Sequence, residues 1–162
     1  MIIIIFCFFP IIIFNLIFPL KYRKLIKDNC ELCGLKKEIV SSLIFVESRY
    51  RYNAESNKGA VGLMQIMPST AIAFKENMAN VEELYDPIVN IEIGCRFLAY
   101  LYDKYQDDIM VLACYNAGEG VVLKWAGEDK KLSINEIKYD ETYQYVKKVL
   151  RMRKVYKYRI YG

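Results

Sequence analysis

The hydrophobic positions along the chain recur at helical spacing and are separated by short polar segments. Over residues 35–48, Val40, Leu43 and Ile44 fall at i, i+3 and i+4, which predicts one buried helical face. Further helices are expected to start at Pro68, to run from Asp86-Pro87 to about Tyr105, to run from Asp107 or Asp108 to about Gly118, and to cover residues 119–126 and 141–158. Alternating strand patterns are rare, so the body is predicted to be mostly α, with room for a small β-hairpin near residues 60–66.

Residues 1–20 form a near-continuous apolar run that contains no charged residue. As a helix this run spans roughly 30 Å, about the thickness of one hydrocarbon core. No small-residue cleavage site of the A-x-A type is present, which favours a retained N-terminal transmembrane helix over a cleaved signal peptide. The predicted organisation is a membrane anchor over residues 1–20, a juxtamembrane connector over 21–34 and a helical domain over 35–162.

The amino-acid composition says little about the fold, but it excludes several kinds of catalytic chemistry. The chain has 162 residues, of which 54% are apolar and 26% charged, and this suits one globular domain with a short extension. It contains no histidine, which excludes Ser-His-Asp and Cys-His catalysis and histidine-ligated zinc. Acid–base work would fall to Glu, Asp, Lys, Tyr or Cys. No phosphate-binding loop and no set of metal ligands occurs in the sequence, so no cofactor is expected.

The five cysteines give a weaker signal. Cys30 and Cys33 have the spacing of a redox pair or of half a zinc site, but the chain has no second C-x-x-C and no histidine to complete a site. Chance spacing or a local disulfide is therefore favoured over a metal or redox role. Cys95 and Cys114 lie in apolar helical patterns and are expected to be buried free thiols, while Cys7 lies in the apolar leader.

The last predicted helix separates charge from apolar surface. Residues 142–162 contain seven Lys or Arg and no acid, and Lys147, Arg151 and Lys154 share one face. A solvated helix face is the favoured interpretation, and contact with an anionic lipid or wall polymer is the alternative. Nucleic-acid binding has only this helix to support it and is not expected.

Glu47 takes the i+7 position of the stripe that starts at Val40. The helix would turn its carboxyl toward the core or a cleft wall, where desolvation disfavours the charged form and raises the pKa. A carboxylic acid still protonated near neutral pH can donate a proton to a leaving oxygen. Alternatively, Glu47 ends the helix with its carboxylate in water or paired with Arg49 or Arg51, and position alone leaves both interpretations open.

The loop after Glu47 favours a binding role. Gly59 and Gly62 flank a tight segment and allow backbone to approach a ligand closely. Gln65 is an amide within an apolar patch, where it needs partners and offers both a donor and an acceptor. The acetamido group of a sugar presents the matching pair of groups.

Several short blocks occur in an order that resembles a known family. They are "ES-x-Y" at 47–50, Ser56, "GAVGLMQIMPSTA" at 59–71, "DP-x-x-NI-x-x-G" at 86–94, "YNAG" at 115–118 and "ETYQYV" at 141–146. Over about residues 38–150 the chain resembles the catalytic domain of the soluble lytic transglycosylases, relatives of goose-type lysozyme. The resemblance implies a lysozyme-like helical domain with a cleft for peptidoglycan glycan strands.

The resemblance also implies roles for individual residues. Glu47 matches the family's single catalytic acid, and the residues matching its substrate-binding positions are Ser56, Gln65, Met67, Tyr115, Asn116, Glu141 and Tyr145. Some of these have simpler interpretations: Tyr115 as plain core, Asn116 as a helix C-cap, and Glu141 as an acid in the first turn of a helix.

The implied reaction cleaves the MurNAc–GlcNAc β-1,4 bond without water and leaves 1,6-anhydroMurNAc ends. One alternative is a hydrolytic muramidase, which needs a second carboxylate, with Asp86, Glu55 and Glu119 as the acids to check. Another is a membrane-anchored glycan-binding protein without catalysis. The basic residues Lys21, Arg23 and Lys24 after the apolar run favour a cytoplasmic body. A peptidoglycan substrate outweighs that rule and places the domain on the wall side of the membrane.

Overall fold

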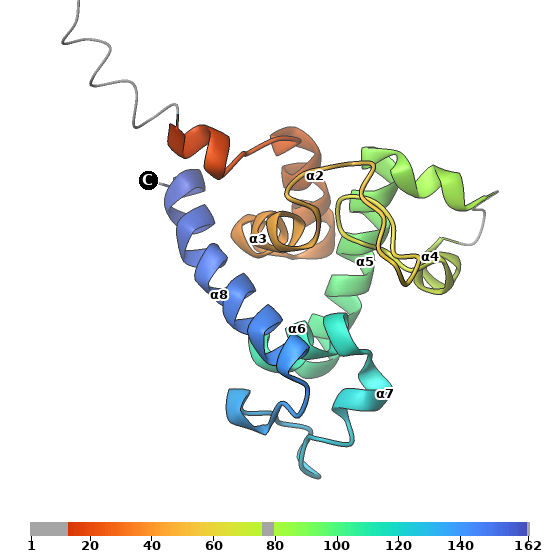
Figure 1. Ribbon diagram of the computed structural model, residues 1–162, viewed down its shortest axis with the longest axis vertical. Helices are drawn as coiled ribbons and strands as arrows, with labels where there is room; N and C mark the ends of the chain where they lie inside the picture. The colour runs from red at the N-terminus through yellow and green to blue at the C-terminus, as the bar shows by residue number, and fades with distance from the viewer. Residues whose placement is uncertain (1–12, 76–79, 162) are drawn as a thin grey trace, which may run out of the picture.

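The computed structural model describes residues 13–75 and 80–161, and the described part of the chain is helical and contains no β-strand (Figure 1). The elements are α2 (Arg23–Cys33), α3 (Lys37–Ser48), α4 (Pro68–Phe74), η1 (Val81–Tyr85), α5 (Pro87–Tyr105), α6 (Asp108–Ala117), α7 (Glu119–Val122), η2 (Ile134–Glu136) and α8 (Asp140–Tyr161). The prediction of a mostly helical domain is therefore confirmed.

Helix α3 lies at the centre of the fold. In Figure 1 it is seen nearly end-on, with α8 along one side and α5 along the other. The predicted apolar face of α3, Val40, Leu43 and Ile44, is fully buried, and so are Val146 and Val149 of α8. Full burial of a side chain of this kind stabilises the fold by about 1.5–3 kcal/mol. The contact between α3 and α8 thus fixes the ends of both helices relative to each other.

Aspartates set the starts of α5 and α6. The side chain of Asp86 accepts a hydrogen bond from Ile88 N at 2.8 Å, and that of Asp107 accepts one from Met110 N at 2.8 Å. Each bond satisfies a backbone N–H that the first helical turn leaves without a partner. The predicted boundaries of α5, from Asp86-Pro87 to Tyr105, are confirmed.

The predicted hairpin near residues 60–66 does not form. Isolated bridges join Val61 to Glu55 and to Ile66, but no ladder continues from them among the described residues. Gly62 and Gln65 have φ of +81° and +48°, so the chain turns back sharply between the paired residues. Left-handed residues at these two places leave too little extended backbone for a strand.

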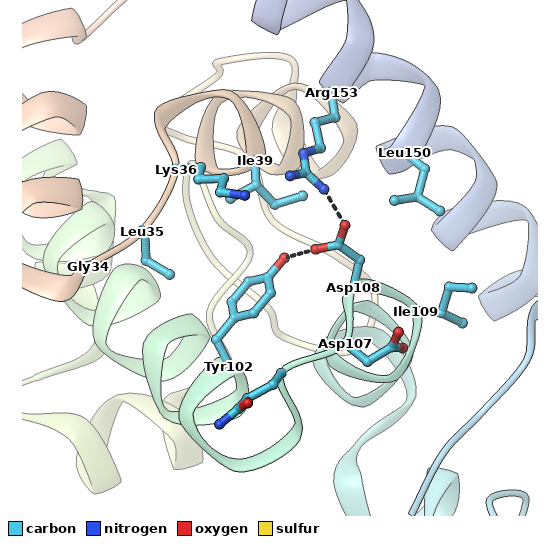
Figure 2. Close-up of a pocket in the computed structure, with 11 residues that line it drawn as sticks. Gly34, Leu35, Lys36, Ile39, Tyr102, Asp107, Asp108, Ile109, Leu150 and Arg153 are labelled. Carbon is cyan, nitrogen blue, oxygen red and sulfur yellow. Dashed lines mark hydrogen bonds and ion pairs between the residues drawn. The ribbon is translucent and has the colours of Figure 1, made fainter.

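A polar cluster holds α5, α6 and α8 together at one side of the molecule. The carboxylate of Asp108 accepts a hydrogen bond from Tyr102 at 2.7 Å and pairs with Arg153 (Figure 2). These three residues line a hollow of about 700 Å³ whose rim includes Lys36 and Ile39 at the start of α3. Glu47 lies at the other end of α3, so the hollow and the catalytic acid proposed from the sequence are separate.

The predicted membrane anchor falls largely on residues outside the described part of the chain. Within residues 13–75 and 80–161, no helix has the length and apolar character needed to cross a bilayer. Residues 13–17 are helical and lie beside the end of α8, where Tyr156 donates to Pro19 O at 2.8 Å and Arg159 donates to Asn15 at 2.6 Å. Figure 1 shows this segment at the same corner as the C-terminus.

The cysteines of the described residues are all free thiols. Cys30, Cys95 and Cys114 are buried, as expected for the last two, and Cys33 is partly exposed. The local disulfide between Cys30 and Cys33 considered from their spacing is therefore not formed, and Cys7 lies outside the described residues.

Candidate active site

Glu47 lies one residue before the end of α3, and the backbone beyond it turns sharply. Arg49 and Tyr50 adopt φ of +51° and +61°, a left-handed conformation that ends the helix. The hydroxyl of Ser48 donates to Leu63 O at 2.8 Å and so ties the helix end to the following loop. The carboxyl of Glu47 is therefore held by a rigid helix at the point where the loop meets it.

The environment of Glu47 favours its protonated form. Burial raises the pKa of this carboxyl to about 7, while the hydrogen bond from Tyr145 and the charge of Lys148 act to lower it. The phenol of Tyr145, on α8, donates to Glu47 Oε1 at 2.6 Å. Since a hydrogen-bond donor stabilises the carboxylate, Tyr145 limits the rise caused by burial. A carboxyl with a pKa near 7 can both donate and accept a proton at neutral pH.

Tyr115 forms a second side of the site. Its hydroxyl donates to Met64 O at 2.9 Å, and its ring packs on Phe97 with the centroids 5.0 Å apart. Burial raises the pKa of Tyr115 well above its usual value, and the charge of Glu47 adds to that rise. Tyr115 therefore stays neutral beside the acid, and α6 is joined through it to the loop after α3.

Asn90, in α5, holds the loop that follows α3 through hydrogen bonds to its backbone. Its Oδ1 accepts from Met64 N at 2.8 Å, and its Nδ2 donates to Val61 O at 2.9 Å and to Leu84 O at 2.8 Å. The side chain is fully buried, so these bonds satisfy backbone groups that water cannot reach. One amide thus determines the path of the loop that faces Glu47.

The loop residues proposed to bind sugar make bonds within the loop itself. Gln65 Nε2 donates to Ala54 O at 3.1 Å and to Gly62 O at 3.0 Å. Ser56 Oγ accepts from the backbone N–H of Ala60 at 2.9 Å. Met67, the N-cap of α4, has 38% of its surface exposed. In the free protein Gln65 and Ser56 thus shape the loop, and Met67 is accessible.

Glu141 and Asn116 are the remaining two predicted positions. Glu141 links α8 to the loop after α3, and Asn116 links α6 to α8. Glu141 lies exposed in the first turn of α8 and pairs with Lys58 of the loop at 3.7 Å. Asn116 Oδ1 accepts from Thr142 Oγ1 at 2.8 Å. The C-cap of α6 is Gly118, so the interpretation of Asn116 as a helix cap is wrong.

Three contributors to the site had no role predicted from the sequence, although Ser48 and Asn90 lie within the blocks that resemble the family. Asn90 is a polar residue on an otherwise apolar stripe of α5. A polar side chain in such a stripe predicts a buried group that makes hydrogen bonds. Lys148 follows Tyr145 by three residues, so helical spacing could have placed both on one face. The contact of Ser48 with Leu63 gave no sequence signal, because it depends on how the loop folds back.

The bond from Tyr145 gives a direct test of the electrostatics. Tyr145→Phe removes a donor that stabilises the carboxylate, so the pKa of Glu47 is expected to rise above about 7. The pKa can be followed by ¹³C NMR of carboxyl-labelled glutamate, with the Glu47 signal assigned by its loss in Glu47→Gln. Tyr115→Phe is the matched control, because that hydroxyl bonds to Met64 O and not to Glu47. An unchanged or lower pKa in Tyr145→Phe would contradict the assigned role.

The helical body of the chain corresponds to a fold found in solved structures. The chain is similar to the lytic transglycosylase Slt inactive mutant from Pseudomonas aeruginosa, with a TM-score of 0.82 and 30% identity over 88% of this chain and 25% of that one. In sequence, residues 24–138 match the model of the Transglycosylase SLT domain. The chain belongs to this family.

Two curated relatives extend the comparison. The soluble lytic murein transglycosylase of Escherichia coli K12 is 34% identical over 87% of this chain and 24% of its own length. The membrane-bound lytic murein transglycosylase E of Buchnera aphidicola is 33% identical over 72% of this chain and 58% of its own length. The chain thus spans about a quarter of the first relative and somewhat more than half of the second.

Proposed function

We propose that this chain is a peptidoglycan lytic transglycosylase that cleaves the MurNAc–GlcNAc β-1,4 bond without water. The observation that carries the proposal is the half-buried carboxyl of Glu47, with a pKa of about 7, held by Tyr145 at the end of α3. Membership of the family and the names of the relatives support it. The similar Pseudomonas structure is of a mutant described as inactive, in which a glutamate is replaced by glutamine.

In the proposed reaction Glu47 acts twice. Its protonated carboxyl first gives a proton to the glycosidic oxygen, and the bond from that oxygen to C1 of MurNAc breaks. The N-acetyl group of the same sugar stabilises the cationic centre at C1. The carboxylate then takes the proton of the C6 hydroxyl, whose oxygen bonds to C1 and closes the 1,6-anhydro ring. Glu47 is left protonated again, and no water is consumed.

The raised pKa fits both of these steps. A carboxyl with an ordinary pKa would be almost wholly ionised at pH 7 and would seldom hold the proton that the first step needs. A much higher pKa would leave the acid form unable to lose that proton easily. The opposing effects of burial and of the Tyr145 hydroxyl keep the value near neutrality. Tyr115, Gln65 and Met67 are the proposed contacts to the sugar, and Ser56, Asn116 and Glu141 support the walls.

The acids considered for a muramidase have other partners. Asp86 caps α5, and Glu55 accepts a hydrogen bond from Tyr85 at 2.9 Å. Glu119 contacts Lys104, which lowers the pKa of its carboxyl. A water-activating carboxylate must be free to hold water opposite the catalytic acid. The engagement of all three acids favours the transglycosylase over the hydrolase.

The proposed location is the wall side of a membrane, with the chain anchored through residues 1–20. The uncharged apolar run supports this, and so does the Buchnera relative, which is named as membrane-bound. The function itself is tested by digesting purified peptidoglycan with the full chain in a nonionic detergent and analysing the fragments by mass spectrometry. Fragments ending in anhydroMurNAc are expected. Intact glycan, with Glu47→Gln behaving identically, would overturn the proposal.

A further inference from the structure

A second concave site lies at the opposite end of α3 from Glu47. It is a hollow of about 300 Å³ between α2, the first turns of α3 and the end of α8, and it is called the basic pocket below. Lys37 at its edge begins α3, and Glu47 follows ten residues later, which corresponds to about 15 Å along a helix. The basic pocket is therefore separate from the proposed active site.

Four cations and no acid line the basic pocket: Arg23, Lys24, Lys27 and Lys37. Lys24 and Lys27 form ion pairs with Asp28 and Glu31, at 2.6 and 3.8 Å, outside the pocket. Such exposed pairs are weak and exchange readily. Among residues 13–75 and 80–161, neither Arg23 nor Lys37 has an ion-pair partner, so no carboxylate neutralises these two charges. The ammonium of Lys37 lies over the ring of Tyr161, 5.1 Å from its centroid, a contact that leaves the positive charge in place.

The start of α2 adds to this positive field. Its N-cap residue, Tyr22, makes no side-chain capping bond, and its first turn contains no acid. Arg23 and Lys24 occupy the positions where Asp or Glu would complement the helix dipole. An anion bound here would offset both the dipole and the two cations.

Ser41 also lines the pocket, but its hydroxyl faces the core. The residue is fully buried, and the Tyr50 hydroxyl beside it donates to Ser41 O at 3.3 Å. A hydrogen bond from the Ser41 side chain partly offsets the rise that burial causes in the pKa of Tyr50. The cations, and not Ser41, are therefore the groups that can hold a ligand in the basic pocket.

The rest of the lining is apolar and points to a lipid. Leu20, Ile26 and Ile160 complete the wall of the pocket. Beside it, the segment at residues 13–18 exposes Leu16 and Ile17, which are 76% and 50% accessible. A free phosphate needs no apolar wall, whereas the headgroup of a lipid brings its glycerol and acyl carbons with it. The apolar segment and the cations thus suit one ligand at a membrane surface.

We propose that the basic pocket binds the phosphate of an anionic membrane phospholipid, with Arg23 and Lys37 pairing with the phosphate. This goes beyond the proposed reaction and does not depend on it. Bound in this way, the domain would contact the bilayer through the start of α2 and the end of α8. The end of α3 that carries Glu47 would then lie away from the lipid, toward the wall.

Binding of a short-chain lipid to the full chain tests this proposal. The protein in an uncharged detergent is titrated with dihexanoylphosphatidylglycerol, and ³¹P NMR follows the bound fraction. Arg23→Gln/Lys37→Gln is expected to bind about thirtyfold more weakly, since each Lys or Arg near anionic lipid contributes about fivefold. The matched control, Lys124→Gln/Lys138→Gln, removes the same charge from exposed positions elsewhere and should bind as the unchanged chain does. Equal affinity of the two double variants would overturn the proposal.

The other probes separate lipid from alternative ligands. Equal binding of dihexanoylphosphatidylcholine, or of glycerol phosphate alone, would contradict a site for anionic lipid. Preferential binding of poly(glycerol phosphate) would replace the lipid by a wall polymer. Cleavage of solubilised peptidoglycan by all these variants should be unchanged, which keeps this test independent of the catalytic proposal.

Discussion

Replacing Glu47 by glutamine is expected to reduce glycan cleavage by about 10³-fold or more, because one side chain serves as acid and then as base. Glutamine has nearly the same shape, and its amide oxygen can still accept the hydrogen bond from Tyr145. The variant should therefore fold normally but lack an acidic proton to give to the glycosidic oxygen. Release of soluble fragments from purified peptidoglycan measures the loss. Glu128→Gln, at an exposed position in the loop after α7, is the matched control and should be fully active.

The same variant has a predicted effect on stability whose sign depends on pH. The pKa of Glu47 is about 7 in the folded chain and 4.5 as its ordinary value. Between these values the folded state binds more protons than the unfolded state, so this group makes the fold less stable as pH rises. Glutamine does not ionise. Glu47→Gln should thus be more stable than the unchanged chain at pH 8, by about 3 kcal/mol, with no such gain near pH 4. A gain that is the same at both pH values would contradict the raised pKa.

Gly62→Ala is expected to lower the free energy of unfolding by about 3–5 kcal/mol, through left-handed strain and overpacking together. Gly62 has φ of +81°, and a Cβ at this position would lie 2.2 Å from Asn90 Nδ2 and 2.5 Å from Leu84 O. The second contact is with backbone, which cannot move aside as a flexible side chain does. Displacing Asn90 would also free Met64 N, so the loop facing Glu47 should shift and cleavage should fall with stability.

Gly59 provides a matched control within the same loop. It has nearly the same left-handed φ, +82°, but a Cβ there would meet no atom within 4 Å. Gly59→Ala should therefore show backbone strain alone, about 1–2 kcal/mol. Urea unfolding of both variants gives the comparison, with the slope of unfolding free energy against urea expected to stay constant. Equal losses for the two variants would show that packing against Asn90 and Leu84 is unimportant.

The helices were readable from the sequence because their signals are local. Asp86-Pro87 and the apolar stripe behind it determine α5 almost to the residue, and the stripe of α3 correctly turns Glu47 toward a desolvated position. Both depend on spacing along one helix, which tertiary contacts do not alter.

The partners of polar side chains were not readable in the same way. Gln65 was expected to offer its amide to a sugar, and in the free protein that amide bonds to Ala54 O and Gly62 O. Asn90 holds a loop 26 residues away along the chain. The left-handed turn that replaces the predicted hairpin is likewise determined by packing, since Gln65 has no intrinsic need for a positive φ.

The products of peptidoglycan digestion test the central claim most directly. Purified peptidoglycan is digested with the full chain, the fragments are treated with borohydride, and their masses are compared with those from a hydrolytic muramidase. A transglycosylase that uses Glu47 alone should leave 1,6-anhydroMurNAc ends, which are lighter by one water and resist reduction, and Glu47→Gln should yield none. Reducible MurNAc ends that have gained a water would contradict the proposed mechanism and identify a hydrolase.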